Sequence, residues 1–338
     1  MTKKNNSIQK PMRLVRIDIM VGLAMLFVVV GHLSVGFEPR WYSVGLHSWI
    51  YSFHMEMFFF LSAFLIRYTY KGIQSPLEYA KYIWRKFKKF FVWFFIIGMT
   101  VSIIAPLFRH EPLSASSLWQ SLRTLLLYPR WSEASFLWYI YVLFGFYLIS
   151  PLFFRLPQLW QVLCCIAAMF LAMHNGGSLF AADEFCQYTF FYCFGVLCAE
   201  WIDEIRSFKL WMWASLSTPF IAFSIWVFTA GYNMGFTFRQ LQWWTLVTGM
   251  SSLPFFYFVT TGIQKVKSLS NAFSAISRNC YIIYLLQMFV IWTCTWAIKQ
   301  FGLTDTIPFI VFMAVTSTMA ILIPIAIAHF YRKLTANK

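Results

Sequence analysis

Apolar residues fill the chain in long runs separated by short polar or basic segments. A helix needs about 20 mainly apolar residues to cross a bilayer core, because its backbone polar groups must be satisfied within the segment. The pattern therefore predicts an all-α, polytopic integral membrane protein with about ten transmembrane helices. The fifth and sixth runs are the shortest. The predicted spans are residues 17–34, 49–66, 90–108, 136–154, 159–173, 185–198, 210–231, 241–262, 280–298 and 307–330.

The apolar runs leave no polar stretch long enough to fold separately. We therefore expect one membrane domain over residues 17–330, between a basic N-terminal arm at 1–16 and a basic tail at 331–338. The first run is long and is not followed by a small-residue cleavage site, so we interpret it as a retained span and not as a signal peptide.

Composition supports a membrane protein, since 60% of the 338 residues are hydrophobic and only 12% are charged. About a quarter of the residues are charged in soluble domains. These values exclude a disordered chain, a disulfide-rich scaffold and a classical nucleic-acid binder. The 7 cysteines lie mostly within predicted spans without metal-ligand spacing, which favours a packing role and no bound metal.

The net charge of +15 is explained by topology. Ten spans place both termini on one side, and assigning that side to the cytoplasm puts 21 of the 27 Lys and Arg residues inside and 6 outside. This asymmetry is the positive-inside rule. The excess charge requires no nucleic acid, and the lipid bilayer is the expected environment.

Ionisable residues within spans are the strongest functional candidates, because each costs several kcal/mol unless it has a partner or faces a wet cavity. His32, His54 and Glu56 are such residues, and Asp18 lies at the cytoplasmic mouth of the first span. Asp18 and His32 share one helix face and are separated by roughly 21 Å along the axis. The second span returns inward, so His54 should lie at a depth similar to that of His32.

Two interpretations of these histidines remain open. Each can hold neighbouring helices together by a hydrogen bond, or a neutral imidazole can take a proton from a hydroxyl and return it during acyl transfer. Glu56 follows His54 by two positions and is about 200° away around the helix, so it cannot simply orient His54. A structural pairing of Glu56 with a basic or hydroxyl group is equally compatible with the sequence.

A basic segment, residues 71–89, precedes the third span and is expected to be a cytoplasmic loop. Its cluster at 85–89, which includes Arg85 and Lys88, is suited to anchoring lipid headgroups. Alternatively, the same charges suit the phosphates of a nucleotide-bearing acyl donor such as coenzyme A.

Several motifs resemble a known family. They are RID at 16–18 with VVVGH at 28–32, FHMEMFFFLSA at 53–63, WRKF at 84–87, LWY at 137–139 and SRNCYIIYLLQ at 277–287. In this order they resemble the acyltransferase family 3 membrane proteins, particularly the fucose-4-O-acetylase-like branch. The resemblance covers nearly the whole chain, and the first two motifs together are the most specific.

The resemblance implies transfer of an acyl group, usually acetyl from acetyl-CoA, to a sugar hydroxyl of a surface polysaccharide or its lipid-linked precursor. It implies a multi-pass protein of the bacterial inner membrane, working beside polysaccharide-synthesis machinery, with acyl-CoA as co-substrate and no bound cofactor. His32 and His54 match the family's two histidines, and Arg85 matches a basic arginine near the donor. Oxyanion donors or substrate contacts are expected at Trp138, Tyr139, Tyr284 and Gln287.

Three positions depart from the family pattern. Val21 stands where Arg or Lys is common, Glu56 replaces a proline, and Gln287 replaces a histidine. These departures are compatible with a different acyl group or acceptor, a relocated charge, or a family member that no longer catalyses. Val21 and Gln287 also keep open an exporter or flippase of a glycan or lipid-linked sugar, and a structural subunit of a synthesis complex is a further alternative. The enzyme should consume a thioester, whereas a transporter should move glycan without forming an acyl product.

Overall fold

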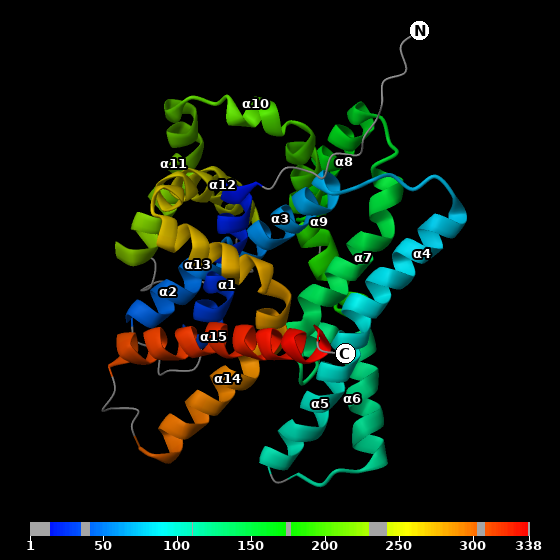
Figure 1. Cartoon of the computed structure of the whole chain (residues 1–338), viewed down its shortest axis with the longest axis vertical. Helices are drawn as coiled ribbons and strands as arrows, with labels where there is room; N and C mark the ends of the chain where they lie inside the picture. The colour runs from blue at the N-terminus through cyan, green and yellow to red at the C-terminus, as the bar shows by residue number, and fades with distance from the viewer. Residues whose placement is uncertain are drawn as a thin grey trace.

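The chain forms a bundle of helices (Figure 1). The computed structural model describes residues 14–34, 41–109, 111–173, 177–229, 242–302 and 308–336, and these contain helices and no strand. The predicted all-α class is therefore confirmed. Most of the predicted basic arm at 1–16 and the last two residues of the tail lie outside the described residues.

Eight described helical segments are long and apolar enough to cross a membrane. Of the two remaining predicted spans, 159–173 corresponds to a helix of only 14 residues and 185–198 lies in a helix of 19 residues that is not among the eight. These two are consecutive, so counting both or neither leaves the termini on the same side. The multi-pass architecture is confirmed, while the number ten and the cytoplasmic termini stay predictions. The eight segments are Val15–Ser34, Gly45–Tyr68, Pro76–Phe108, Ser135–Phe153, Leu210–Thr229, Trp243–Lys265, Cys280–Gln300 and Phe309–Thr335.

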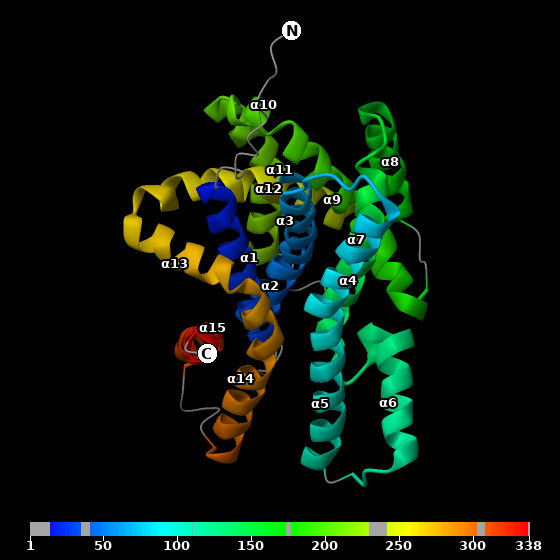
Figure 2. The same ribbon diagram turned by 45° about the vertical axis from the view of Figure 1, so that its right-hand side comes forward.

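The first half of the chain begins with α1 and a broken helix, α2 and α3, and α3 packs along α9. A long helix made of α4, the π-helical segment η1 and α5 follows, and α6 returns antiparallel to α5 (Figure 2). The bounds are α1 Val15–Ser34, α2 Trp41–Tyr51, α3 His54–Tyr68, α4 Pro76–Lys86, η1 Phe87–Phe91, α5 Val92–Phe108, α6 Ala115–Leu127, η2 Pro129–Trp131, η3 Ser135–Leu137, α7 Trp138–Phe153, α8 Gln158–Leu171, η4 Leu179–Ala181 and α9 Ala182–Glu200.

The second half packs around α1, which contacts α12, α13, α14 and α15. Helix α15 runs across the view in Figure 1 and is seen end-on in Figure 2, so it crosses the direction of α5. The bounds are α10 Ile202–Arg206, α11 Leu210–Thr229, α12 Gln242–Lys265, α13 Lys267–Arg278, α14 Cys280–Gln300 and α15 Phe309–Ala336.

The basic segment at 71–89 is helical from Pro76 onward, so the expectation of a loop was wrong for residues 76–89, while its cytoplasmic side stays a prediction. Helix α4 begins at Pro76 and continues through η1 into α5. The hydroxyl of Ser75 accepts from the backbone N–H of Glu78, and the Glu78 carboxylate accepts from the N–H of Gln74 at 2.8 Å. The Ser75 hydroxyl thus satisfies one N–H group of the first turn, Pro76 has no N–H to satisfy, and Glu78 binds the backbone just before the cap, which explains why the helix starts here.

Two glycines let helix backbones approach each other closely, as small residues commonly do in membranes. A Cβ atom on Gly22 of α1 would lie 2.4 Å from the carbonyl oxygen of Phe273 of α13. A Cβ atom on Gly195 of α9 would lie 2.3 Å from the carbonyl oxygen of Phe60 of α3. The absence of a side chain at these positions therefore sets how closely α1 packs on α13 and α3 packs on α9, and α1 and α3 carry the candidate histidines.

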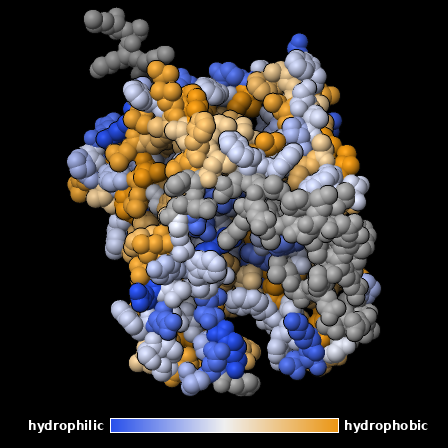
Figure 3. All heavy atoms as spheres, turned by 180° about the vertical axis from the view of Figure 1, so that it is seen from behind, coloured by the Kyte–Doolittle hydropathy of each residue, from blue (hydrophilic) through white to orange (hydrophobic). Residues whose placement is uncertain are grey.

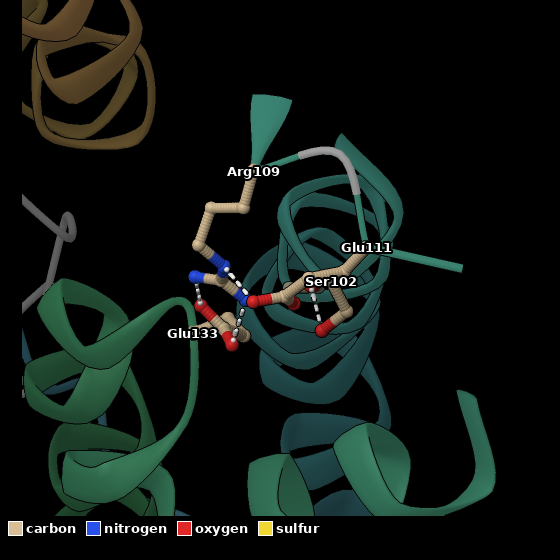
Figure 4. A network of polar contacts seen from close by, with 5 residues as sticks. Ser102, Arg109, Glu111 and Glu133 are labelled. Atoms are coloured by element: carbon tan, nitrogen blue, oxygen red, sulfur yellow. Dashed lines mark hydrogen bonds and ion pairs between the residues drawn. The ribbon is translucent and has the colours of Figure 1, made fainter. Parts of the chain in front are cut away.

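An ion-pair network ties the connection between α5 and α6 to the segment before α7 (Figure 4). Arg109 donates to Glu111 at 3.0 Å and to both carboxylate oxygens of Glu133 at 2.8 and 3.1 Å. These hydrogen bonds from Arg109 lower the pKa of the Glu133 carboxyl.

Hydrophilic side chains gather at the lower end of the face in Figure 3, whereas hydrophobic ones dominate its upper half.

Candidate functional site

The break between α2 and α3 positions His54, the first residue of α3. Its Nδ1 lies 2.8 Å from the carbonyl oxygen of Ile50. A carbonyl oxygen can only accept, so Nδ1–H is the donor and the neutral ring carries its free lone pair on Nε2. The interrupted helix thus supplies the group that selects the tautomer of a buried histidine, and Nε2 is the atom able to accept a proton.

His47 and Tyr51 of α2 form a row of rings with His54. The ring centroids of His47 and Tyr51 are 3.9 Å apart, and those of Tyr51 and His54 are 4.6 Å apart. His47 Nδ1 lies 3.0 Å from the hydroxyl oxygen of Ser34, whose own O–H donates to the Gly31 carbonyl. His47 therefore donates through Nδ1 and also keeps Nε2 as an acceptor.

His32 lies near the end of α1 that faces this row. A Cβ atom on the preceding Gly31 would lie 3.2 Å from the ring of Tyr51, so the glycine allows α2 to approach. His32 and His47 are close enough for their charges to interact, and so are His32 and His54. The buried Nδ1 of His32 has no hydrogen-bond partner among the described residues. Of the three imidazoles, His32 thus has a nitrogen that the fold leaves unused.

Arg130 brings a positive charge to the histidines from outside α1, α2 and α3. It belongs to η2, its Nε lies 3.6 Å from a carboxylate oxygen of Glu184, and its guanidinium carbon lies 4.8 Å from the Trp138 ring centroid. Its charge acts on both His32 and His54. Trp138, a predicted site residue, therefore lies beside the site and holds Arg130 through its ring.

Tyr139 and Tyr284 use their hydroxyls elsewhere. The Tyr139 hydroxyl lies 2.6 Å from the Ser62 hydroxyl of α3, and the Tyr284 hydroxyl donates to the carbonyl of Phe136. The two rings meet edge to face at a centroid distance of 5.6 Å. Tyr139 thus ties α7 to α3 and Tyr284 ties α14 to η3, and neither hydroxyl bonds to a histidine among the described residues.

Gln287 is fully buried, and neither its amide oxygen nor its nitrogen has a partner among the described residues. The position of Gln287 along the bundle can be compared with that of His32, because the sulfur atoms of Met25 on α1 and Cys280 on α14 are 3.5 Å apart. His32 and Gln287 each follow one of these residues by seven positions, and α1 and α14 run in the same direction in Figure 2. Both side chains therefore lie about 10 Å beyond that contact, which places Gln287 at the depth of His32.

Glu56 points toward α9 and α12. It is fully buried beside the side chain of Gln187, and a Cβ atom on Gly249 would lie only 2.8 Å from its Cγ. One carboxylate oxygen has no partner among the described residues. These contacts agree with the angular separation from His54 expected from the sequence.

The predicted donor residues lie apart from the histidines. Arg85 and Lys88 are exposed, and the Lys88 ammonium lies 5.7 Å from the Trp84 ring centroid. Asp18 lies near the opposite end of α1 from His32. Lys86, which sequence reasoning did not single out, points inward, with its ammonium 4.0 Å from the Tyr147 ring centroid.

Sequence reasoning missed His47, Tyr51 and Arg130 as members of this site. The spacing of His47, Tyr51 and His54 at i, i+4 and i+7 was a usable helix-face signal. Arg130 gave no such signal, because it reaches the histidines from an irregular segment far along the chain. In the part of the chain that the structure describes, no three His, Cys, Asp or Glu side chains are grouped so as to hold a metal ion.

The model of a protein family described as an acyltransferase domain matches residues 14–329. The chain belongs to the acyltransferase 3 family. It is accordingly a multi-pass membrane acyltransferase, and the matched region contains every histidine, aromatic and basic residue of the candidate site. No curated protein and no solved structure gives a significant match to the chain.

Proposed function

We propose that this acyltransferase moves an acetyl group from acetyl-CoA to a hydroxyl of a surface polysaccharide or its lipid-linked precursor. The observation that carries the proposal is the grouping of His32, His47 and His54 near one end of α1: His47 and His54 donate through Nδ1, and the buried Nδ1 of His32 has no partner among the described residues. Imidazole is the side chain best suited to take and return a proton near neutral pH.

His32 is the general base in this proposal, and His54 assists it. An imidazole nitrogen accepts the proton of the sugar hydroxyl while the hydroxyl oxygen attacks the thioester carbonyl. The resulting tetrahedral intermediate collapses by breaking its C–S bond, and the thiolate of coenzyme A takes up the proton from the imidazolium. The products are an O-acetyl ester and free coenzyme A, and the histidine returns to its neutral form.

Arg130 and Gln287 are suited to stabilising the negative oxygen of that intermediate. A guanidinium carries five N–H donors, and the ion pair with Glu184 and the Trp138 ring keep Arg130 beside the histidines. Gln287 offers an unpartnered amide at the same depth. Donors held in place before reaction are effective because no reorganisation is needed when charge develops. Tyr139 and Tyr284 are assigned a supporting role instead, because their hydroxyls already bond to α3 and to Phe136.

The donor is proposed to enter from the cytoplasm, with its phosphates near Arg85 and Lys88 and its pantetheine arm extending toward the histidines. Both side chains are exposed, as phosphate-binding groups at an entrance must be. A bacterial inner membrane is the corresponding location, because it offers cytosolic acetyl-CoA on one side and surface glycan on the other.

The decisive experiment measures acetyl transfer from labelled acetyl-CoA in membranes containing equal amounts of each variant, with surface glycan analysed for O-acetyl groups. His32→Ala should lower the rate by about 10²–10⁴-fold, the usual contribution of a general base. His329→Ala is the matched control, because His329 is exposed on α15, and it should leave the rate unchanged. Full activity of His32→Ala would refute the assignment of the base. Glycan export that fails without any change in acetylation would support transport instead.

A further inference from the structure

Two adjoining cavities lie at the end of α1 opposite His32. One, of about 340 Å³, is almost entirely apolar and lies among α1, α3, α9, α11 and α12. The other, of about 400 Å³, is lined by the polar side chains of Arg16, Arg206 and Gln264. Ile17, Ile202 and Tyr257 line both cavities, so a charged cavity and a hydrocarbon cavity lie directly against each other.

A stack of three side chains marks the boundary between the two parts. The Arg16 guanidinium carbon lies 5.5 Å from the Tyr257 ring centroid, and the Trp213 ring stacks with Tyr257 at 4.7 Å. Arg16 is in the polar cavity and Trp213 is in the apolar one. The Nε of Arg16 donates to the Gln264 side chain at 3.2 Å, which uses one of the five guanidinium N–H donors and holds the group in place.

The polar part carries excess positive charge. Arg206 pairs with Asp203 at 3.3 Å, but the Asp203 side chain is 87% exposed, so this pair is weak and readily rearranged. Arg16 has a neutral partner in Gln264. Two guanidinium groups around one small cavity form a good site for a phosphate, which guanidinium binds through paired hydrogen bonds.

The apolar part is suited to a hydrocarbon chain. Its volume falls within the range of about 300–1,000 Å³ that is usual for ligand pockets, and Phe60, Phe64 and Phe194 are among its walls. Its serine, Ser251, already donates to the Val247 carbonyl at 2.6 Å. A pantetheine arm contains amides that need hydrogen-bond partners, so a lipid chain fits this lining better than coenzyme A does.

We propose that the adjoining cavities bind a phosphate-headed lipid, with the phosphate at Arg16 and Arg206 and the chain in the apolar part. The site is independent of acyl transfer as proposed above, because Ile17 and His32 are separated by roughly 22 Å along α1. A membrane glycerophospholipid and a polyprenyl phosphate share the required chemistry.

The test uses the full chain in detergent and a phosphatidylglycerol with a photoreactive diazirine in its chain. After irradiation, labelled peptides are mapped by mass spectrometry. We expect adducts on the peptides containing Phe64, Phe194 and Met250, and a fall of at least several-fold in these adducts for Arg16→Gln. Arg278→Gln removes an equal charge from an exposed position outside the cavities and should leave the labelling unchanged.

A second variant distinguishes loss of lipid binding from misfolding. Leu216 lines the apolar part but is half exposed, so Leu216→Trp should occupy chain volume and reduce the adducts while leaving the charges intact. Stronger competition by polyprenyl phosphate than by unlabelled phosphatidylglycerol would identify the former as the ligand, and the reverse order would identify the latter. Equal labelling by an uncharged lipid, insensitivity to Arg16→Gln, or strongest competition by a long-chain acyl-CoA would overturn the proposal.

Discussion

Replacing Gly195 by alanine should separate α9 from α3 and move the segment that carries His54. The new Cβ atom would lie 2.3 Å from the carbonyl oxygen of Phe60, whereas an ordinary contact begins at 3.4 Å. The helices must therefore separate locally by about 1 Å, since the atom in the way belongs to the backbone. Overpacking of this kind costs about 1–3 kcal/mol of stability, and a 1 Å misplacement in an active site can lower the rate by about 10²-fold.

The assay combines thermal unfolding of the purified protein in detergent with the rate of acetyl transfer at a temperature where the variant is folded. Gly262→Ala is the matched control because a Cβ atom there would meet nothing within 4 Å. It should leave activity unchanged and can raise helix stability by up to about 1 kcal/mol. Unchanged unfolding and unchanged activity of Gly195→Ala would show that the close approach of α3 and α9 does not fix the site.

Three further outcomes are expected. Arg130→Gln should lower kcat by about 10²–10³-fold with little change in KM, the effect of losing an oxyanion donor, and Arg130→Lys should restore only part of it; a change in KM alone would indicate substrate binding. Glu56→Gln should retain most of the acetyl-transfer rate, because the carboxyl faces α9 and α12 and not the histidines; loss of activity with normal folding would give Glu56 a chemical role. Arg109 lowers the pKa of Glu133 in the folded protein. The stabilisation from this pair is therefore present above the unfolded pKa of about 4.3 and is lost as pH falls through the folded value. Glu133→Gln should reduce the acid dependence of unfolding measured between pH 6 and 3.

The depth of the site was predictable from the sequence, because the rise per residue of a helix is fixed. Counting along two adjacent spans places His32 and His54 at a similar level, and the structure brings them within electrostatic range. The rotation of each helix about its axis was not predictable in the same way. Tyr139 and Tyr284 illustrate this, because their hydroxyls bond to Ser62 and Phe136 and do not face the histidines.

A local helix-capping motif can be recognised in the sequence, whereas a contact between distant parts of the chain cannot. The helix start at Ser75, Pro76 and Glu78 was present in the sequence, but the segment was interpreted as a loop joining two apolar spans. The position of Arg130 could not be deduced, because η2 has no periodic pattern and the contact joins distant parts of the chain. The pairing with Glu184 and the ring of Trp138 exist only once α7 and α9 have packed.

The position of Arg130 also bears on the absence of a cation at Val21. Residue 21 precedes His32 by eleven positions and so lies about 16 Å deeper along α1, whereas Arg130 is near enough to His32 for its charge to have an effect there. Arg130 therefore cannot replace a cation at position 21, and Val21 itself is buried among apolar neighbours. Cations are found instead near the two ends of α1, at Arg16 and Arg130. A donor arm that passes along this helix would meet apolar side chains at the depth of Val21 and the positive charge of Arg130 where its acyl end reaches His32.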